Sequence, residues 1–228
     1  MDISLEKEFP SQFFGVPCDV TKDEDLQAAF TLAKERHGFI DLVVNNAAIV
    51  HEGNWKEMID INIKGVIACT KIALEFMSKK NGGRGGDIFQ IGSVAFKTPH
   101  PMFPVYSATK SALSTYTHAL VNGEKFAQMG VRVNCLHPGP VDTESTHFEP
   151  EQLREGHFAI STKLRATGNL ATTKQVSEAV LKFLDEVGDQ QGCDVIITGE
   201  GYRIDENPTK DVMKDFKYFT RRESLNPI

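Results

Sequence analysis

The stretch "DIFQIGSVAFKTPHPMFPVYSATK", residues 87–110, joins a buried strand to an amphipathic helix. Its apolar first part, 87–93, predicts a short β-strand that ends on Ser93. Pro104 is suited to the first turn of a helix, and the pattern continues helical over 104–128. The segment therefore predicts a strand, a connection and a helix, with a serine at the strand end.

Tyr106 and Lys110 are four residues apart, so they share one face of this helix and can meet. An ammonium group and the positive end of the helix dipole both lower the pKa of a tyrosine from its reference value of about 10. With Ser93 at the same point, the residues predict an acid–base pair and a hydrogen-bond donor around a carbonyl or alcohol. A bare Tyr-x-x-x-Lys pair is more often a core tyrosine beside a solvated lysine. The position of Ser93 and the surrounding motifs favour the catalytic interpretation.

Short apolar strands alternate with amphipathic helices along the chain. We expect strands at 13–20, 39–46, 87–93, 131–136 and 193–199, and helices at 21–38, 54–80, 104–128, 150–164 and 175–186. Thr21 with Glu24 predicts a capping box, and Gly38 predicts the end of the same helix. This order predicts an α/β fold: a doubly wound, Rossmann-type parallel sheet in three layers. Residues 1–228 are expected to form one domain, with 204–228 as a C-terminal tail.

Ligands of such sheets bind beyond the carboxyl ends of the strands. We therefore expect the residues that follow the predicted strands to crowd one edge: Asp19, Asn45, Asn46, Ala47, Ser93, Pro138 and Gly139.

Composition excludes several classes of function. Lysine and arginine number 25 against 31 acidic residues, and the net charge of −6 argues against nucleic-acid binding. The seven histidines form no H-x-x-x-H pair, so no metal site is expected. The four cysteines form no Cys-x-x-Cys pair and are expected to be unpaired thiols in a reducing compartment. Without a signal peptide or a membrane-length apolar run, we expect a cytoplasmic protein with no membrane partner.

Five motifs in order resemble the short-chain dehydrogenase/reductase family over nearly the whole chain: "CDV" (18–20), "NNAA" (45–48), "IN" (61–62), Ser93 with "YSATK" (106–110), and "HPGPVDT" (137–143). Three longer stretches resemble its 15-hydroxyprostaglandin dehydrogenase-like branch: "NWKEMIDIN" (54–62), "FMSKKNGGRGG" (76–86) and "PVYSATK" (104–110).

The resemblance implies a role for each matching residue. Tyr106 would be the general acid and base, and Lys110 would lower its pKa and hold the nicotinamide ribose. Ser93 would orient the substrate oxygen. Asn62 would support a water that links Lys110 to solvent, although a satisfied buried amide is the alternative. Asn is unfavourable inside a helix, which fits either reading.

The resemblance also implies NAD as the cofactor and a homodimer formed through helices 54–80 and 104–128. The adenosine side would contact Asp19, Val20, Asn46 and Ala47, and the nicotinamide side Pro138, Val141 and Thr143. Residues from about 144 to 170 would bind the substrate.

The implied reaction is hydride transfer between NAD(H) and a secondary alcohol or ketone. The family's "NNAG" is "NNAA" here, so Ala48 adds a methyl group beside the cofactor. Phe103 replaces a polar residue of the 15-hydroxyprostaglandin dehydrogenase-like enzymes, and "HPMF" (100–103) would form an apolar lip. We therefore expect a hydrophobic, lipid-like or aromatic alcohol as the small-molecule substrate.

The family begins with a glycine-rich β-α-β segment that binds the pyrophosphate, and this sequence contains no G-x-G-x-x-G. We expect this sequence to be an N-terminally truncated form of the fold. The alternative to an enzyme is a non-catalytic relative with impaired cofactor binding that acts through dimerisation.

Overall fold

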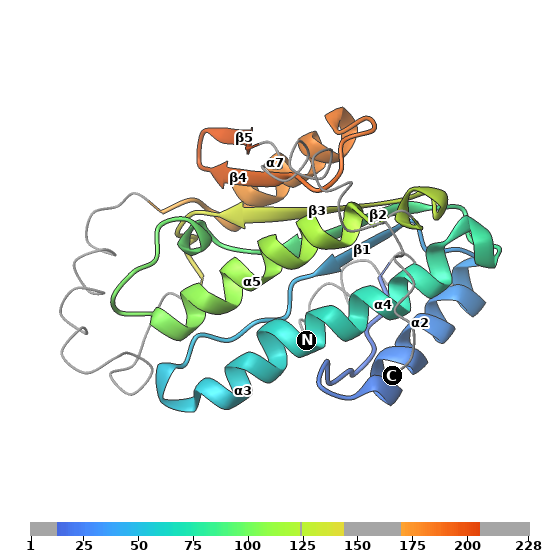
Figure 1. The fold of residues 1–228 in the computed structure, drawn as a ribbon, viewed down its shortest axis with the longest axis horizontal. Coiled ribbons are helices and arrows are strands. Elements are labelled where there is room, and N and C mark those ends of the chain that lie inside the picture. The colour runs from blue at the N-terminus through green and yellow to red at the C-terminus, as the bar shows by residue number, and fades with distance from the viewer. Residues whose placement is uncertain (1–12, 124, 144–169, 206–228) are drawn as a thin grey trace, which may run out of the picture.

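The computed structural model describes residues 13–123, 125–143 and 170–205. Within them, five strands form one sheet: β1 (Leu42–Asn45), β2 (Gly86–Ile91), β3 (Val131–Pro138), β4 (Asp194–Thr198) and β5 (Gly201–Asp205). The strands lie in the order β1-β2-β3-β4-β5 (Figure 1). β1 to β4 are parallel, and β5 joins β4 antiparallel. With helices on both faces, this confirms the predicted Rossmann-type α/β fold.

The described helices are α2 (Asp23–His37), α3 (Trp55–Ile59), α4 (Val66–Met77), α5 (Pro104–Val121) and α7 (Thr173–Glu186). A π-helical turn, Asp60–Gly65, joins α3 to α4, so the helix predicted over 54–80 is interrupted. Such turns are rare and are frequent at functional sites. α5 begins at Pro104 as predicted but ends at Val121, and a short 3₁₀ turn covers Phe126–Gln128.

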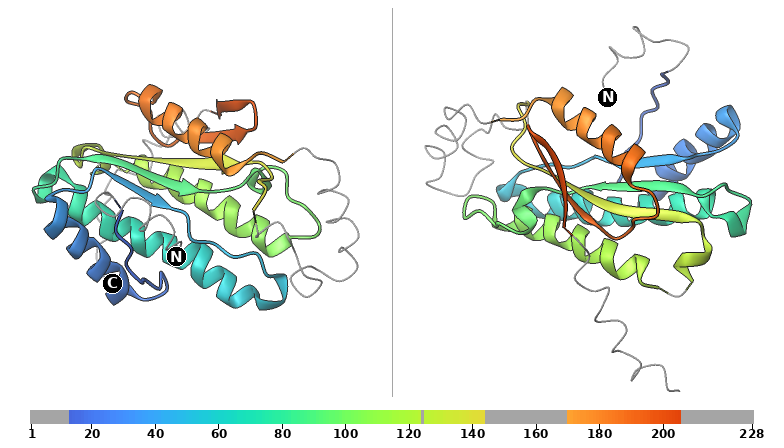
Figure 2. Two further views of the ribbon diagram at one scale, coloured as in Figure 1. Left: turned by 180° about the vertical axis from the view of Figure 1, so that it is seen from behind. Right: turned by 90° about the horizontal axis from the view of Figure 1, so that it is seen from above.

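The sheet has a separate apolar core on each face. One core packs α2, α4 and α5 against the sheet, and the other packs α7 against β2, β3 and β4. Figure 2 shows α7 on one side and α2, α4 and α5 on the other. Ile88 belongs to the first core and its neighbour Phe89 to the second, because successive side chains of a strand point to opposite faces.

Residues 13–20 form no strand, so that prediction is wrong. A buried strand needs a neighbour to satisfy its backbone polar groups. In the described sheet β1 pairs with β2 alone, and 13–20 contributes no pairing. The side chains of Leu42 and Val44, 39% and 45% exposed, lie at this edge.

The helix ends predicted from the sequence are confirmed only in part. Thr21 forms no capping box, because its amide and hydroxyl both donate to Asp19 Oδ1, at 3.0 and 2.7 Å. Gly38 ends α2 as predicted, with φ 82° and its N–H donated to the Lys34 carbonyl. None of the described helices is both long and apolar enough to cross a membrane.

β5 was not predicted, and its last residue, Asp205, lies inside the segment expected to be tail. The helix predicted at 150–164, most of the expected substrate segment and the remainder of the tail lie outside the described residues.

Candidate active site

The carboxyl ends of three neighbouring parallel strands meet at one edge of the sheet. Asn45 ends β1, Ser93 follows β2, and Pro138 ends β3. Asn45 is buried, and its amide donates to Gln90 Oε1 at 2.8 Å and to Thr70 Oγ1 at 3.1 Å. These buried polar groups are mutually satisfied, so they fix the floor of the site without leaving a donor unpaired.

Tyr106 lies in the first turn of α5 and interacts with Ser93. Burial raises the pKa of Tyr106, and a hydrogen bond with the Ser93 side chain acts in the opposite direction. The net shift is upward, so the predicted lowering of this pKa by Lys110 is wrong for this structure. The Lys110 ammonium lies 5.5 Å from the Tyr106 ring centroid and donates its hydrogen bond elsewhere.

Lys110 is almost fully buried, with 2% of its surface exposed. Its Nζ donates to the Ile91 carbonyl at 2.8 Å, at the end of β2. Burial lowers the pKa of Lys110 to about 8, and the neighbouring Cys135 acts in the opposite direction. An amine with this pKa can exchange a proton near neutral pH.

Asn62 lies in the π-helical turn and is fully buried. Its Oδ1 accepts from the Ile49 N–H, and its Nδ2 donates to the Ile49 carbonyl, both at 2.9 Å. Nδ2 also donates to Thr109 Oγ1 at 3.3 Å. The amide therefore ties the chain after β1 to α5, beside Lys110, which matches the satisfied buried role left open by the sequence.

Sequence reasoning missed Glu52. Its carboxylate accepts the N–H groups of Val105, at 3.2 Å, and of Tyr106, at 3.0 Å. It therefore caps the first turn of α5, with a carboxylate placed where the helix dipole is positive. Because Glu52 and Tyr106 are 54 positions apart, no local sequence pattern predicts the contact.

Phe103 is half-buried, and its ring lies edge-on to Tyr106 with centroids 6.3 Å apart. His100 lies 6.1 Å from Phe103 on the same side. Met102 is fully buried, so it belongs to the core and not to the predicted apolar lip. Of the four expected lip residues, Phe103 has the direct aromatic contact with Tyr106.

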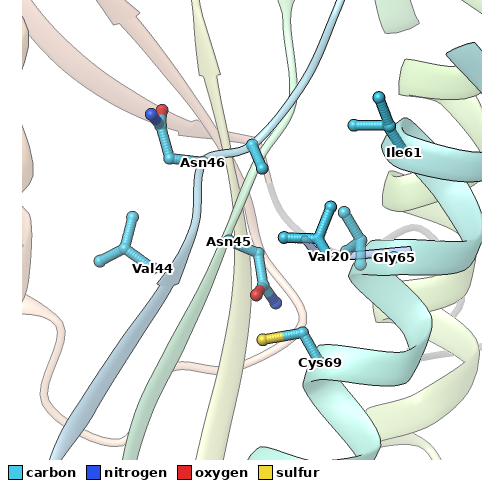
Figure 3. Close-up of a pocket in the computed structure, with 9 residues that line it drawn as sticks. Val20, Val44, Asn45, Asn46, Ile61, Gly65 and Cys69 are labelled. Atoms are coloured by element: carbon cyan, nitrogen blue, oxygen red, sulfur yellow. The ribbon is translucent and has the colours of Figure 1, made fainter. Parts of the chain in front are cut away.

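The expected adenosine side contains a cavity of about 110 Å³ between β1 and the π-helical turn (Figure 3). Three of the residues expected at the adenosine side, Val20, Asn46 and Ala47, line this cavity, together with Val44, Asn45, Ile61, Gly65, Val66 and Cys69. A Cβ on Gly65 would lie 3.0 Å from Val20, so glycine permits the close approach. Apolar walls and one exposed amide fit one ring system of a dinucleotide, so the residues fit this part of the cofactor.

The other predicted cofactor residues occupy two places. Asp19 is exposed and lies before α2, and hydrogen bonds from Thr21 lower its pKa. Pro138 ends β3, and Val141 pairs with Ala171 in an isolated parallel bridge, with Thr143 two residues on. The exposed Ala48 follows the cavity residues along the chain.

Comparison with known proteins matches residues 3–154 to the family described as short chain dehydrogenase. The chain is 36% identical over 141 residues to 15-hydroxyprostaglandin dehydrogenase [NAD(+)] of Mus musculus, covering 61% of this chain and 52% of the relative. It is 29% identical over 212 residues to L-fucose dehydrogenase of Bos taurus, covering 86% and 74%. It is 33% identical over 152 residues to glucose 1-dehydrogenase 2 of Bacillus subtilis (strain 168), covering 63% and 57%. The chain spans about half the length of the first of these relatives.

Proposed function

Because the chain belongs to the short-chain dehydrogenase family, we propose that it is an oxidoreductase that transfers a hydride between NAD(H) and a secondary alcohol or ketone. The observation that carries the proposal is the placement of Ser93, Tyr106 and the buried Lys110 at the carboxyl edge of the sheet. The relatives are dehydrogenases by name, which supports the reaction class.

The cofactor would lie across the strand ends. Val20, Asn46 and Ala47 would hold its adenosine side, where the cavity lies, together with Asp19, the residue before Val20. Pro138, Val141 and Thr143 would hold the nicotinamide side with Tyr106 and Lys110. When bound, the nicotinamide would supply or accept the hydride.

The chain's own residues would handle the proton. The Tyr106 hydroxyl would exchange a proton with the substrate oxygen, and Ser93 would hold that oxygen by a hydrogen bond. Lys110 would support the proton exchange, because burial has already brought its pKa to about 8. Asn62 would act by fixing α5 through Thr109, with the water-supporting role inherited from the family as a further part of the proposal.

An apolar, lipid-like or aromatic alcohol is the proposed substrate class, because the Phe103 ring stands beside Tyr106. NAD is preferred over NADP because relatives named for NAD(+) match the chain. A homodimer through α4 and α5 and a cytoplasmic location complete the proposal.

Tyr106→Phe tests the proposed function. It removes only the hydroxyl, so turnover of alcohols with NAD should fall by more than about 100-fold while NADH still quenches protein fluorescence. Tyr116→Phe is the control, because Tyr116 is a half-buried tyrosine on the same helix away from Ser93. Undiminished turnover by Tyr106→Phe would reject the acid–base role. A folded, unmodified chain that shows neither NADH binding nor turnover would favour the non-catalytic alternative with impaired cofactor binding.

A further inference from the structure

A buried carboxylate lies behind the candidate active site. Asp194, at the start of β4, has 5% of its surface exposed. It accepts hydrogen bonds at 2.8 Å from Ser114 Oγ and from the His137 ring at Nε2, and His118 Nε2 lies 3.1 Å away. Burial alone would raise the pKa of Asp194, but the neighbouring His118 and the hydrogen bonds from His137 and Ser114 bring it below its usual value. The group is therefore ionised at neutral pH and needs all of its donors.

His137 links Asp194 to Ser93 through its two ring nitrogens. Its Nε2 carries the hydrogen that bonds to Asp194, so in the neutral ring Nδ1 is an acceptor. Nδ1 lies 3.2 Å from the Ser93 nitrogen and 3.1 Å from the Ser93 carbonyl oxygen, and in this tautomer it accepts the Ser93 N–H. The ring is fully buried and stacks on Phe96 at 3.7 Å. A Cβ on Gly92 would lie 2.3 Å from Nδ1, so only glycine lets the ring come this close to the strand end.

The same carboxylate also holds α5. Ser114 lies one helical turn beyond Lys110, and His118 lies one turn further. Asp194 thus receives donors from the helix that carries Tyr106 and, through His137, fixes the backbone of the residue that faces Tyr106. The Ser93 hydroxyl is oriented further because its Oγ accepts the Ala95 N–H at 3.2 Å.

We propose that His137 and Asp194 are positioning residues that set the distance between the Ser93 and Tyr106 hydroxyls. The inference rests on the proposed function, since it assigns Ser93 to the substrate oxygen. Neither residue touches the substrate in this arrangement. They act through the main chain of Ser93 on one side and through α5 on the other, and a misplacement of about 1 Å can cost about 100-fold in rate.

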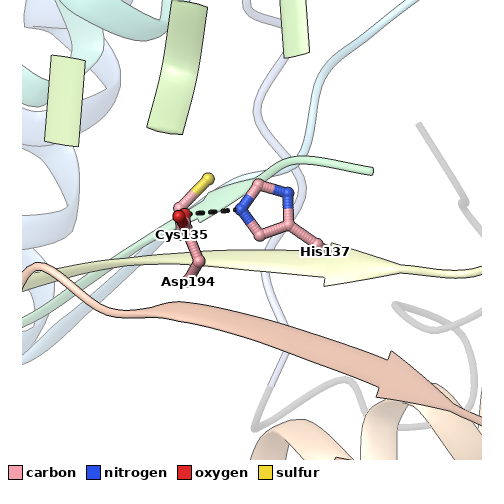
Figure 4. A group of neighbouring side chains, drawn as sticks. All are labelled: Cys135, His137 and Asp194. Carbon is pink, nitrogen blue, oxygen red and sulfur yellow. Dashed lines mark hydrogen bonds and ion pairs between the residues drawn. The ribbon is translucent and has the colours of Figure 1, made fainter. Parts of the chain in front are cut away.

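Cys135, His137 and Asp194 also have the ligand types of a metal site, with ligand atoms within 4.8 Å of one another (Figure 4). The hydrogen bonds favour the positioning role instead. Both ring nitrogens of His137 are already used, and burial raises the pKa of the Cys135 thiol well above its usual value. Lys110 is close enough to act on the same thiol, and its positive charge opposes a second cation.

Two substitutions separate the two contacts of His137. The side-chain amide of Asn reaches about as far as Nδ1 and offers an oxygen to the Ser93 N–H, whereas the amide of Gln reaches towards Asp194. We expect His137→Gln to lower kcat by about 100-fold with little change in NADH affinity. His137→Asn should stay within about tenfold of the wild-type kcat, even if it loses stability, because it keeps the Ser93 contact.

Asp194→Asn is the second test in case His137→Gln does not fold, since it keeps the shape but removes the charge. We expect a lowered kcat and unchanged NADH affinity. Val195→Ala is the matched control, because it opens a cavity beside Asp194 on the face packed against α7 and should lower stability but not kcat. All variants are compared by kcat, by KM and by thermal unfolding.

Equal kcat losses in His137→Gln and His137→Asn, or a loss in Val195→Ala as large as in His137→Gln, would overturn the inference. So would one equivalent of zinc per chain, measured by mass spectrometry and lost in Cys135→Ala. Tyr106→Phe is assayed in parallel. If that variant is inactive while both His137 variants are fully active, the inference fails and the proposed function stands.

Discussion

Lys110, with its buried ammonium group, is the residue on which the candidate site depends most. The i, i+4 spacing already predicted that Lys110 and Tyr106 share a helix face. The direction of the Tyr106 pKa shift could not be predicted, because it depends on burial and on the hydrogen bond with the distant Ser93. The hydrogen bond from Lys110 to the Ile91 carbonyl could not be predicted either, because it joins two elements that are distant in the sequence.

Lys110→Met tests how much the buried charge of Lys110 lowers the free energy of unfolding. The pKa of Lys110 is about 8 in the folded chain and 10.5 as the reference value. The unfolded chain binds more protons between these values, so wild-type stability rises with pH there. The cost is fully present below pH 8 and corresponds to about 3 kcal/mol. The difference in unfolding free energy between wild type and Lys110→Met should therefore shift by about that amount in favour of wild type from pH 7 to pH 10.5.

Urea unfolding at several pH values measures this difference. Lys174→Met is the control, because Lys174 is exposed on α7. The change with pH that Lys110→Met shows beyond that of Lys174→Met is assigned to the buried position. A Lys110→Met difference that is constant from pH 7 to pH 10.5 would contradict the assigned pKa.

At the scale of elements, both the helices and the strands were predicted in part. The pattern located α2, α7 and the first residue of α5 to within a few residues, because helical hydrogen bonds are local, but α5 ends at Val121, well before the predicted end. The predicted strand 13–20 failed and β5 was missed, since a strand exists only with a neighbour and the neighbour is set by the fold. The π-helical turn at Asp60–Gly65 also has no local signal beyond the unfavourable Asn62.

Phe183→Ala tests how α7 is held on the sheet. Phe183 is fully buried, with its ring centroid 5.7 Å from Phe89 and 5.6 Å from Tyr202. Removing the ring should lower the free energy of unfolding by about 3–5 kcal/mol, measured by chemical denaturation. Leu181→Ala on the same helix is the control and should change it by less than about 0.5 kcal/mol, because Leu181 is 60% exposed. Equal losses would contradict the assigned buried face.

At the scale of the whole molecule, the candidate site exists only because several elements meet. Asn45, Ser93 and Pro138 come from three strands, and α5 adds Tyr106 and Lys110. The parallel order of β1, β2 and β3 brings these ends to one edge, as the strand–helix alternation predicted. The cavity beside Val20 depends on the same arrangement, because its walls come from β1 and the π-helical turn.

NADH binding tests this assembled site. At 100 times its dissociation constant, NADH should stabilise the folded chain by about 2.7 kcal/mol, read as a rise in the thermal unfolding midpoint. NADPH at the same concentration is the comparison and should stabilise less. A folded chain with no shift in the presence of NADH would reject the proposed cofactor.

The sequence by itself determined the alternation of strands and helices, the parallel sheet, and the placement of Ser93, Tyr106 and Lys110 at one edge. These follow from local periodicity and from the rule that parallel strands end on the same side. Only the tertiary structure decided which groups surround those residues. Glu52, His137 and Asp194 reach the site across tens of residues. Burial lowers the pKa of Lys110, and the donors around Asp194 keep that carboxylate ionised against the effect of burial. Desolvation and long-range hydrogen bonds depend on the packed neighbours, which no local pattern contains.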